Sequence, residues 1–361
     1  MKKKSIVLFS GGTGGHVIPA TNFGNYLIDN GYDCKLFIDK RGIKYSSKFK
    51  GKIIIINSSH FSGNLIFRFN ALISLTVGLI QSIFHLLFLR PSYCVAFGSY
   101  AASMPLLAAT FLKLFCKIKI YLHEQNSIMG KVNLFFLPLS EKIFVNFSEV
   151  ININKKYESK ICKVGLPNDI KFKKEKRKTK TENGNIIRIF IYGGSQGSVN
   201  LNNGFVKILK KIDQEHYKNF NIVFQSSFKN IDQLKSSLDN LKINYEIKDF
   251  FTNINSILEK SDIVISRAGA GTINDIINSQ IPSILVPLPH SIYNHQFLNA
   301  NYLFDKKAAI LIEENEWNLD KAYKVFKDLC ENINLRESLI KNLQSIKILN
   351  ANKLMFDIIF K

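Results

Sequence analysis

Cysteine is scarce in this sequence of 361 residues, and the five that occur are scattered. An odd number of cysteines, with no C-x-x-C pair among them, argues against both a disulfide framework and a zinc knuckle. The apolar run that follows the N-terminal lysines, Ile6 to Phe9, is too short for a signal peptide and predicts a β-strand instead. We therefore expect a protein of the reducing cytoplasm.

Acidic residues are outnumbered, because 28 Asp and Glu stand against 49 Lys and Arg and give a formal net charge of +21. This excess favours an anionic partner, and charge alone leaves open nucleic acid, an acidic membrane surface or a phosphorylated substrate. The sequence shows no recognisable helix-turn-helix, RNP or zinc motif, and its densest basic run, residues 171–180, is typical of a solvated linker. We therefore expect no nucleic-acid partner.

Formal charges are missing from residues 71–89, an apolar run long enough for a membrane span. Gln81 and His85 interrupt this run, and Arg68 and Arg90 flank it, which argues against spanning. A predicted strand also follows at the short interval of an α/β connection. Three interpretations remain: a span, a buried core helix, or a helix with one face in the core and one toward lipid. The third is favoured.

The apolar content of 46% is enough to bury a core, and a chain of this length usually folds as two domains. Short β-branched and aromatic runs alternate with longer helical patterns, which predicts an α/β fold of βαβ units with parallel sheets. Two such halves join near residue 165. The predicted strands are 5–9, 34–38, 52–56, 94–97, 119–122 and 142–145 in the first half, and 187–192, 221–225, 245–247, 263–266, 283–286 and 309–312 in the second.

Each half has a glycine-rich turn after its first strand, GGTGGH at residues 11–16 and GGSQGS at residues 193–198. Glycines at a strand-to-helix turn let the backbone approach a phosphate, and the helix N-terminus behind them supplies N–H donors. Neither turn fits the G-x-G-x-x-G dinucleotide pattern, and the chain has no P-loop. Asp39, at the end of the second strand, would bind a ribose or cap a turn, and capping is favoured. Each half is predicted to hold a phosphorylated ligand.

Residues 263–300 point to a nucleoside diphosphate. A strand ends in the loop 267–271, and a helix is predicted to start near Thr272 and to present its N–H groups to an anion. Asp275 lies one turn later, where a carboxylate can accept both hydroxyls of a ribose.

Five motifs occur in order: GGTGGH at 11–16, HEQN at 123–126, GGSQG at 193–197, SRAGA at 266–270 and HQxxNA at 295–300. Together they resemble the bacterial N-acetylglucosaminyltransferases that convert lipid I to lipid II in peptidoglycan synthesis, and hence serve cell-wall biogenesis, cell shape and cell division. The resemblance covers roughly residues 5–305. It implies a GT-B architecture of two Rossmann-like domains, UDP-GlcNAc as donor, the undecaprenyl-linked lipid I as acceptor, and neither cofactor nor metal.

The resemblance also implies how the chain is divided. Residues 1–164 would form the acceptor-binding, membrane-facing domain, 165–342 the UDP-GlcNAc domain, and 343–361 a helix that packs back on the first domain. We assign the clamp for the leaving UDP to the turn from Arg267 to Thr272 and to the Ser195 turn. The donor contacts implied are Thr13, Gly14, Gly15, Asn126, Ser195, Ala270, Gly271, Thr272, Ile273, Asn274, Asp275 and Gln296.

The sequence departs from the family in three places. Asp275 stands where the family usually has Glu, one methylene longer. The family's G-N-P-V-R turn becomes GLPND at residues 165–169 and loses an arginine, for which Lys171 or Lys173 would be an imperfect substitute. The second glycine loop of the first half, residues 98–105, has fewer glycines than usual, so an acceptor pyrophosphate is less firmly predicted there.

An α-linked sugar nucleotide that gives a β-linked product requires one inverting displacement, with a base for the acceptor hydroxyl. His16 is the first candidate base, and the alternative is a histidine that binds phosphate or caps the helix. Glu124 is the second candidate, and its alternative is to orient Asn126. His295 is interpreted as structural.

Two rival functions remain open: a GT-B glycolipid glycosyltransferase with a different acceptor, such as a glucosyl- or galactosyltransferase, and an integral-membrane structural protein. We expect a peripheral enzyme on the cytoplasmic face of the inner membrane, docked through residues 71–89 and attracted to anionic lipid.

Overall fold

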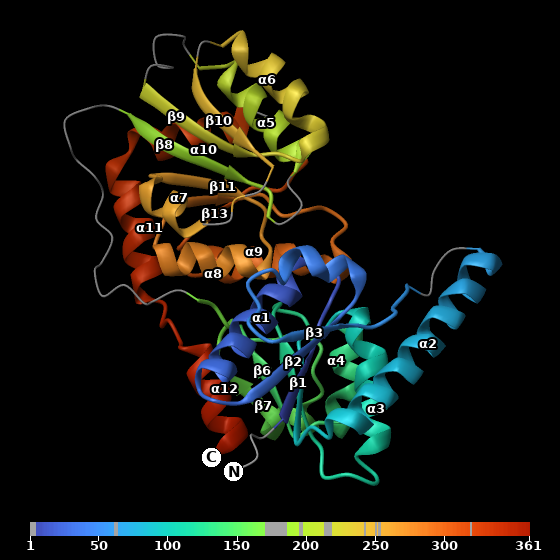
Figure 1. Cartoon of the computed structure of the whole chain (residues 1–361). Helices are drawn as coiled ribbons and strands as arrows, with labels where there is room; N and C mark the ends of the chain where they lie inside the picture. The colour runs from blue at the N-terminus through green and yellow to red at the C-terminus, as the bar shows by residue number, and fades with distance from the viewer. Residues whose placement is uncertain are drawn as a thin grey trace. The chain divides into compact units, whose positions relative to one another are not determined.

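The computed structural model describes residues 5–60, 64–169, 186–194, 198–212, 219–241, 243–249, 251, 254–317 and 320–361 (Figure 1). The basic run 171–180 lies outside these residues. The chain divides into two compact units, the first of Met1–Ile170 with Leu349–Lys361 and the second of Lys171–Ile348. Each unit is an α/β unit around a parallel sheet, as the sequence predicts.

The first unit contains a seven-stranded parallel sheet in the order β3-β2-β1-β4-β5-β6-β7. All six strands predicted for this half are confirmed. The edge strand β7, which pairs with β6 alone, was not predicted. The strands are β1 (Ser5–Phe9), β2 (Asp33–Ile38), β3 (Lys52–Ile55), β4 (Tyr93–Ala96), β5 (Lys119–Glu124), β6 (Lys142–Val145) and β7 (Ile161–Lys163).

The second unit contains a six-stranded parallel sheet in the order β10-β9-β8-β11-β12-β13. All six strands predicted for this half are confirmed, with ends that differ by a residue or two. They are β8 (Ile187–Tyr192), β9 (Phe220–Gln225), β10 (Asn244–Lys248), β11 (Ile263–Ser266), β12 (Ser283–Leu285) and β13 (Ile310–Leu311).

Helices cover both faces of each sheet, so the central strands are apolar on both sides. In β1, Ile6 and Leu8 enter one core layer while Val7 and Phe9 enter the other, as the twofold period of a strand requires. The helices are α1 (Gly14–Asp29), α2 (Leu65–Leu89), α3 (Ser103–Leu112), α4 (Lys131–Phe136), α5 (Val199–Leu209), α6 (Ile231–Asp239), α7 (Ile254–Lys260), α8 (Ala270–Ser279), α9 (His295–Phe304), α10 (Asp320–Glu331), α11 (Ile333–Ser345) and α12 (Ala351–Phe360).

The chain reverses its direction of winding beside the first strand of each sheet. In the first unit this switch lies between β1 and β4, and in the second between β8 and β11. In open α/β sheets ligands bind at such a switch, outside the carboxyl ends of the strands. The two glycine turns follow β1 and β8, so the topology puts both of them at binding positions.

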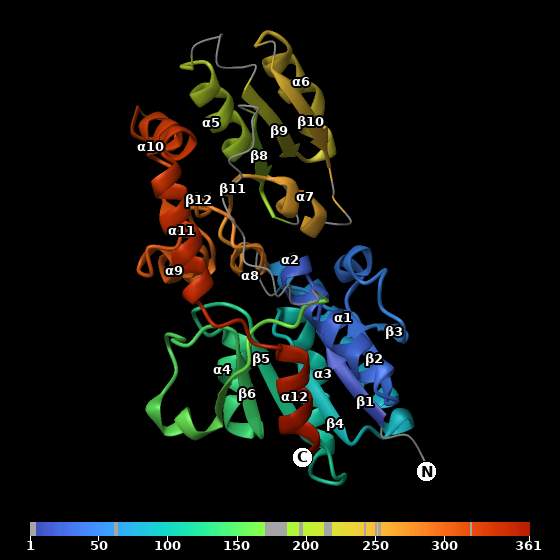
Figure 2. The ribbon, with the colours of Figure 1, turned by 90° about the vertical axis from the view of Figure 1, so that its left-hand side faces the viewer.

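The last helix, α12, belongs to the first unit although its sequence follows the second (Figure 2). Its aromatic side chains contact those of the N-terminal segment: the ring centroids of Phe356 and Tyr32 are 5.5 Å apart, and those of Phe360 and Tyr93 are 5.0 Å apart. Met355 is fully buried beside them. Apolar burial therefore holds the end of the chain on the first unit.

Helix α2 contains the predicted apolar run and extends it by two turns toward the N-terminus. Its length and composition would allow it to cross a membrane. Only 17% of its most apolar stretch is buried inside the protein, and this low burial excludes a buried core helix. Gly78 lets the helix approach the carbonyl of Asn57, because a Cβ at Gly78 would collide with that oxygen, and Gln81 accepts a hydrogen bond from the Asn57 N–H at 2.9 Å. These contacts hold the C-terminal half, whereas the N-terminal turns extend away from the sheet (Figure 1).

Candidate active site

The first glycine turn is shaped by its surroundings. Gly11 and Gly12 have φ values of +153° and +77°, and a Cβ on Gly11 would lie 2.7 Å from Asp39 Oδ1. The Asp39 carboxylate accepts hydrogen bonds from the N–H groups of Gly12 at 2.8 Å and Gly42 at 3.2 Å, and from Arg41 Nε at 2.6 Å. Asp39 therefore caps and supports the turn, as the favoured interpretation holds, and its oxygens are already engaged.

His16 lies in the first turn of α1, after Thr13, Gly14 and Gly15. Its Nδ1 is 2.7 Å from the carbonyl oxygen of Phe97 and 3.2 Å from Gln125 Oε1, so Nδ1 carries the hydrogen and donates it. In the neutral ring the lone pair is then on Nε2. Gln125 also donates to Phe97 O, at 2.9 Å, and so braces the same carbonyl. The fold thus holds one tautomer of His16, the form in which Nε2 can accept a proton.

Glu124 is buried at the end of β5, and each of its oxygens accepts two hydrogen bonds. Oε1 takes the backbone N–H and side-chain amide of Asn126, at 3.1 and 3.3 Å, and Oε2 takes Gly130 N and Asn133 Nδ2, both at 2.9 Å. These four hydrogen bonds engage both oxygens, so Glu124 organises this turn. The geometry therefore supports the alternative role, orientation of Asn126.

His123 is fully buried next to Glu124 and donates from Nε2 to the Gly165 carbonyl at 3.0 Å. Burial lowers the pKa of His123 to about 4, against the opposing effect of the Gly165 carbonyl, so the ring is neutral. Gly165 has φ +88° and begins the GLPND turn at 165–169. Asp169 in that turn lies near Lys48 on the surface, at 4.0 Å, while Lys171 and Lys173 lie outside the described residues.

The second loop of the first unit, which the sequence shows to be poor in glycine, turns at two residues of positive φ, Gly98 at +70° and Ser99 at +72°. A Cβ at Gly98 would lie 3.4 Å from the His16 ring, so the glycine admits the imidazole. The loop then forms a short 3₁₀ helix at Tyr100–Ala102 and leads into α3. It is thus a neighbour of the candidate base.

In the second unit, α8 begins at Ala270, two residues before the predicted start, with Gly269 as a cap that offers no side chain. Its first backbone N–H groups therefore receive no side-chain cap, as an anion-binding helix start requires. Thr272 and Ile273 are buried, and the Ile273 N–H donates to the Gly269 carbonyl at 3.0 Å. Asn274 is tied back, because its Nδ2 donates to Ala270 O at 3.0 Å. Ser195 lies outside the described residues.

Arg267 is buried, and all three nitrogens of its guanidinium bond to groups of the second unit. Nε donates to Ser198 Oγ at 3.0 Å, Nη1 donates to the carbonyls of Val286 and Pro287 at 3.1 and 3.2 Å, and Nη2 forms an ion pair with Glu314. Burial lowers the pKa of Arg267, while Glu314 acts in the opposite direction. The side chain therefore ties the ends of β11 and β12 to the start of α5, rather than presenting its fork to a ligand.

Two further predicted residues are held in place by neighbours. Gln296 Oε1 accepts hydrogen bonds from Ala268 N at 3.3 Å and Leu288 N at 3.0 Å, which fix the orientation of the side-chain amide. Asp275 Oδ2 accepts a hydrogen bond from the hydroxyl of Tyr192 at 3.0 Å. Tyr192 was missed by the sequence reasoning; the signal was an aromatic residue at the last position of β8, directly before the glycine turn.

The predicted site residues are divided between the units: Thr13, Gly14, Gly15, His16, Glu124 and Asn126 belong to the first, and Arg267, the start of α8, Asp275 and Gln296 belong to the second. His295, interpreted as structural, contacts the Ile292 carbonyl through Nδ1 at 2.9 Å, as that interpretation expects. Among the described residues, no three His, Cys, Asp or Glu side chains are grouped as a metal site would need.

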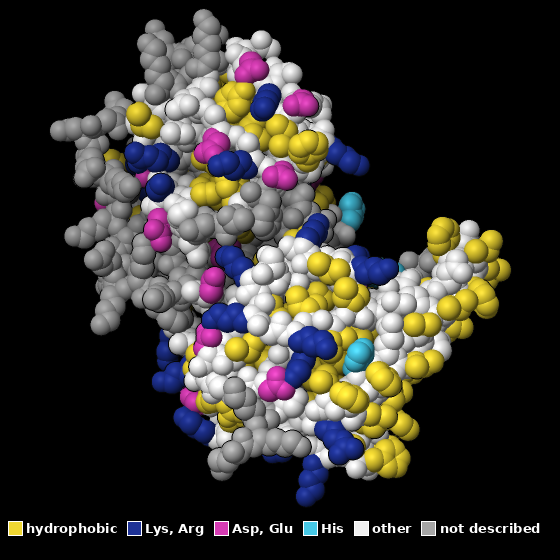
Figure 3. Space-filling view, viewed as in Figure 1, with side chains coloured by type: hydrophobic (Ala, Val, Ile, Leu, Met, Phe, Trp, Pro, Cys, Tyr) yellow, Lys and Arg dark blue, Asp and Glu magenta, His cyan; other side chains and the backbone are white. Residues whose placement is uncertain are grey.

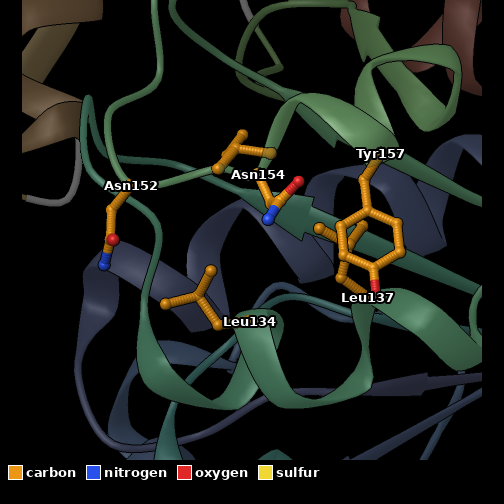
Figure 4. A pocket seen from close by; sticks show the side chains of 6 residues that line it. Leu134, Leu137, Asn152, Asn154 and Tyr157 are labelled. Atoms are coloured by element: carbon orange, nitrogen blue, oxygen red, sulfur yellow. The ribbon is translucent and has the colours of Figure 1, made fainter.

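A pocket of about 320 Å³ opens elsewhere in the first unit, beside α4 (Figure 4). Its lining contains apolar side chains and amides but no acid–base pair, and no predicted site residue contributes to it. It is therefore separate from the predicted site. The lining residues are Leu134, Leu137, Asn152, Ile153, Asn154 and Tyr157.

Two parallel-sheet α/β units, each with its first strand at the switch point of the sheet, form the architecture of the GT-B fold. The structure is similar to that of MurG from Acinetobacter baumannii, with a TM-score of 0.76 at 21% identity over 99% of both chains. It is also similar to the kitacinnamycin glycotransferase, with a TM-score of 0.74 at 14% identity over 99% of both chains. At sequence identities of 21% and 14%, these similarities show a shared fold and nothing further.

The sequence comparisons give the family. Residues 6–145 match the glycosyltransferase family 28 N-terminal domain and residues 188–353 its C-terminal domain. The chain belongs to glycosyltransferase family 28, which confirms the resemblance drawn from the five motifs. It is 34% identical over 349 residues, 94% of both chains, to a curated protein of Rickettsia felis, and 34% identical over 378 residues, 95% of both, to one of Rickettsia prowazekii. Both are named UDP-N-acetylglucosamine--N-acetylmuramyl-(pentapeptide) pyrophosphoryl-undecaprenol N-acetylglucosamine transferase.

Proposed function

We propose that this glycosyltransferase moves GlcNAc from UDP-GlcNAc to the 4-hydroxyl of the muramoyl-pentapeptide of lipid I and so forms lipid II for peptidoglycan. The observation that carries the proposal is the likeness, over 94% of the chain, to curated relatives named for this transfer. The rival acceptors, other glycolipids, have no such support.

The donor belongs to the second unit in this proposal. The uncapped start of α8 receives the diphosphate, the Asp275 carboxylate accepts the ribose hydroxyls, and the Gln296 amide donates to the nucleotide sugar. Arg267 acts indirectly, because it is buried and anchors Ser198 beside the second glycine turn. Ser195, in that turn, remains a predicted donor contact.

The acceptor and the base belong to the first unit. His16 Nε2 takes the proton of the 4-hydroxyl as the oxygen attacks the anomeric carbon, the C–O bond to UDP breaks, and UDP leaves with the electron pair. One displacement inverts the α-linkage to β. Glu124 orients Asn126 instead of acting as the base, and Thr13, Gly14, Gly15 and Asn126 remain predicted donor contacts.

We also propose that the enzyme docks on the cytoplasmic face of the membrane through the apolar surface of α2 and α3 (Figure 3). No acidic residue occurs between Leu65 and Leu89, and Arg68 and Arg90 provide positive charge near both ends. Each basic residue near an anionic bilayer contributes about 1 kcal/mol, and apolar insertion adds a second signal. The exposed side chains of this surface are Leu65, Ile66, Phe67, Phe69, Leu72, Ile73, Ile80, Phe84, Leu87, Phe88, Phe111, Leu114 and Phe115.

A transfer assay tests the proposed reaction. With a short-chain lipid I analogue, labelled GlcNAc from UDP-GlcNAc should appear in a product of the size of lipid II, and UDP-glucose should serve poorly as donor. Transfer to another glycolipid but not to lipid I would contradict the proposed acceptor and leave the glycosyltransferase class intact.

Liposome flotation tests the docking surface. Binding should rise with the anionic lipid fraction, fall partly at high salt, and drop further for Phe84→Ser with Phe88→Ser, because these rings are 65% and 83% exposed and contribute little to the core. Phe228→Ser, which removes a ring that is 80% exposed on the second unit, is the matched control and should bind normally. Binding that ignores lipid charge would contradict the electrostatic contribution, and resistance to alkaline carbonate would favour a span.

A further inference from the structure

The Asp275 carboxylate, which is proposed to bind the ribose, is hydrogen-bonded to the phenol of Tyr192. Tyr192 is the last residue of β8, and Asp275 lies in the second turn of α8, which follows β11, the neighbour of β8 in the sheet. The Tyr192 hydroxyl donates to Asp275 Oδ2 at 3.0 Å, and the Tyr192 side chain is 5% exposed. The switch point of the second sheet therefore brings together two residues 83 positions apart.

The direction of this hydrogen bond is settled by its chemistry. An ionised carboxylate has no hydrogen to give, so the phenol must be the donor. Burial raises the pKa of Tyr192 well above its usual range, the charge of Asp275 raises it further, and a hydrogen bond with the Thr272 side chain opposes the shift. The phenol therefore keeps its proton near neutral pH and is the donor in this hydrogen bond.

The residue type at position 275 explains why this hydrogen bond matters. The family resemblance predicts Glu at this position, and Asp has a side chain that is shorter by one methylene. A short carboxylate on a half-buried second turn rotates about χ1 and χ2 unless a neighbour fixes it. Hydrogen bonding to Tyr192 fixes one oxygen and with it the plane of the carboxylate.

We propose that Tyr192 is a positioning residue that orients the Asp275 carboxylate for recognition of the ribose hydroxyls of a uridine nucleotide. This inference rests on the proposed function, in which Asp275 contacts the ribose. Tyr192 itself does not touch the reacting atoms; it acts through Asp275, so its removal should affect nucleotide recognition and leave the chemical step nearly unchanged.

The test uses UDP and its analogues lacking the 2′- or the 3′-hydroxyl, with binding measured by calorimetry on the full chain. The wild type should prefer UDP over the better of the two analogues by about tenfold, the value of one hydrogen bond to a charged group. Tyr192→Phe should weaken UDP binding by about three- to tenfold. It should hardly weaken binding of the analogue that lacks the hydroxyl which the oriented Asp275 carboxylate binds. In turnover, the KM for UDP-GlcNAc should rise while kcat stays within about twofold. A role in packing alone would weaken UDP and both analogues by the same factor.

Tyr245→Phe is the matched control, because the Tyr245 hydroxyl donates to Asp239 in a second phenol–carboxylate pair of the same unit. This variant should keep the affinity and the discrimination of the wild type.

A thermal melt checks the fold of Tyr192→Phe. The double variant, Asp275→Glu with Tyr192→Phe, tests the reason for the contact, because the longer carboxylate should recover part of the discrimination. Equal losses for UDP and both analogues in Tyr192→Phe would overturn the inference. If instead the wild type does not discriminate and Asp275→Ala binds UDP normally, the proposed donor site itself fails.

Discussion

Replacing His16 by Ala should lower kcat by about 10² to 10⁴, the usual contribution of a general base, while the KM for UDP-GlcNAc changes little. The reason is the tautomer: Nδ1 donates to the Phe97 carbonyl at 2.7 Å, so the lone pair that accepts the proton is on Nε2. Steady-state kinetics with a lipid I analogue measure the split between kcat and KM. A base acts in the transition state, so the loss should fall on kcat.

His16→Gln is the informative second variant, because glutamine keeps the size and hydrogen-bonding capacity of the side chain but cannot take a proton near neutral pH. It should be as slow as His16→Ala, and added imidazole should partly restore the Ala variant. If both variants retain full turnover and only the acceptor KM rises, His16 binds phosphate or caps the helix, and the base lies elsewhere.

Replacing Asp275 by Ala should weaken UDP binding by about ten- to a hundredfold, since each hydrogen bond to a charged group contributes ~1.5–3 kcal/mol. Titration calorimetry measures the loss. Asp275→Glu, which restores the residue expected of the family, should bind nearly as the wild type does. Unchanged affinity of Asp275→Ala for UDP would remove this residue from the donor site.

Two controls separate recognition from folding in that experiment. Asp275→Asn keeps an acceptor for the Tyr192 hydroxyl but removes the charge, so it should fold as the wild type does and still bind UDP weakly. Asp239→Ala removes the carboxylate of the other phenol–carboxylate pair and should leave UDP binding unchanged.

The strands and the glycine turns were predictable because they follow from local pattern. Residues 187–192 are β-branched or aromatic except for Arg188, as is typical of a buried strand, and two glycines follow them directly. Strand β7 escaped prediction because Ile161–Lys163 contains one β-branched residue and no aromatic residue. The start of α8 was predicted two residues late, because its N-cap, Gly269, has no side chain and so lacks the usual sequence signal of a helix start.

The roles of the polar site residues were less predictable, because they depend on partners that are distant in sequence. Arg267 was expected at the diphosphate, yet its guanidinium joins Ser198, Val286, Pro287 and Glu314. A sequence pattern shows that an arginine is present but not whether its donors are already engaged.

The sequence by itself determined the α/β class, nearly all the strands, the places of both glycine-rich turns and the family, because periodicity, glycine placement and motif order are properties of neighbouring residues. Only the tertiary structure decided which tautomer His16 adopts, that Glu124 is saturated by four donors, that Tyr192 holds Asp275, and that α2 is exposed. His16 and Gln125 are 109 positions apart, and Tyr192 and Asp275 are 83. The order of strands in each sheet brings such pairs together, and no local pattern contains that order.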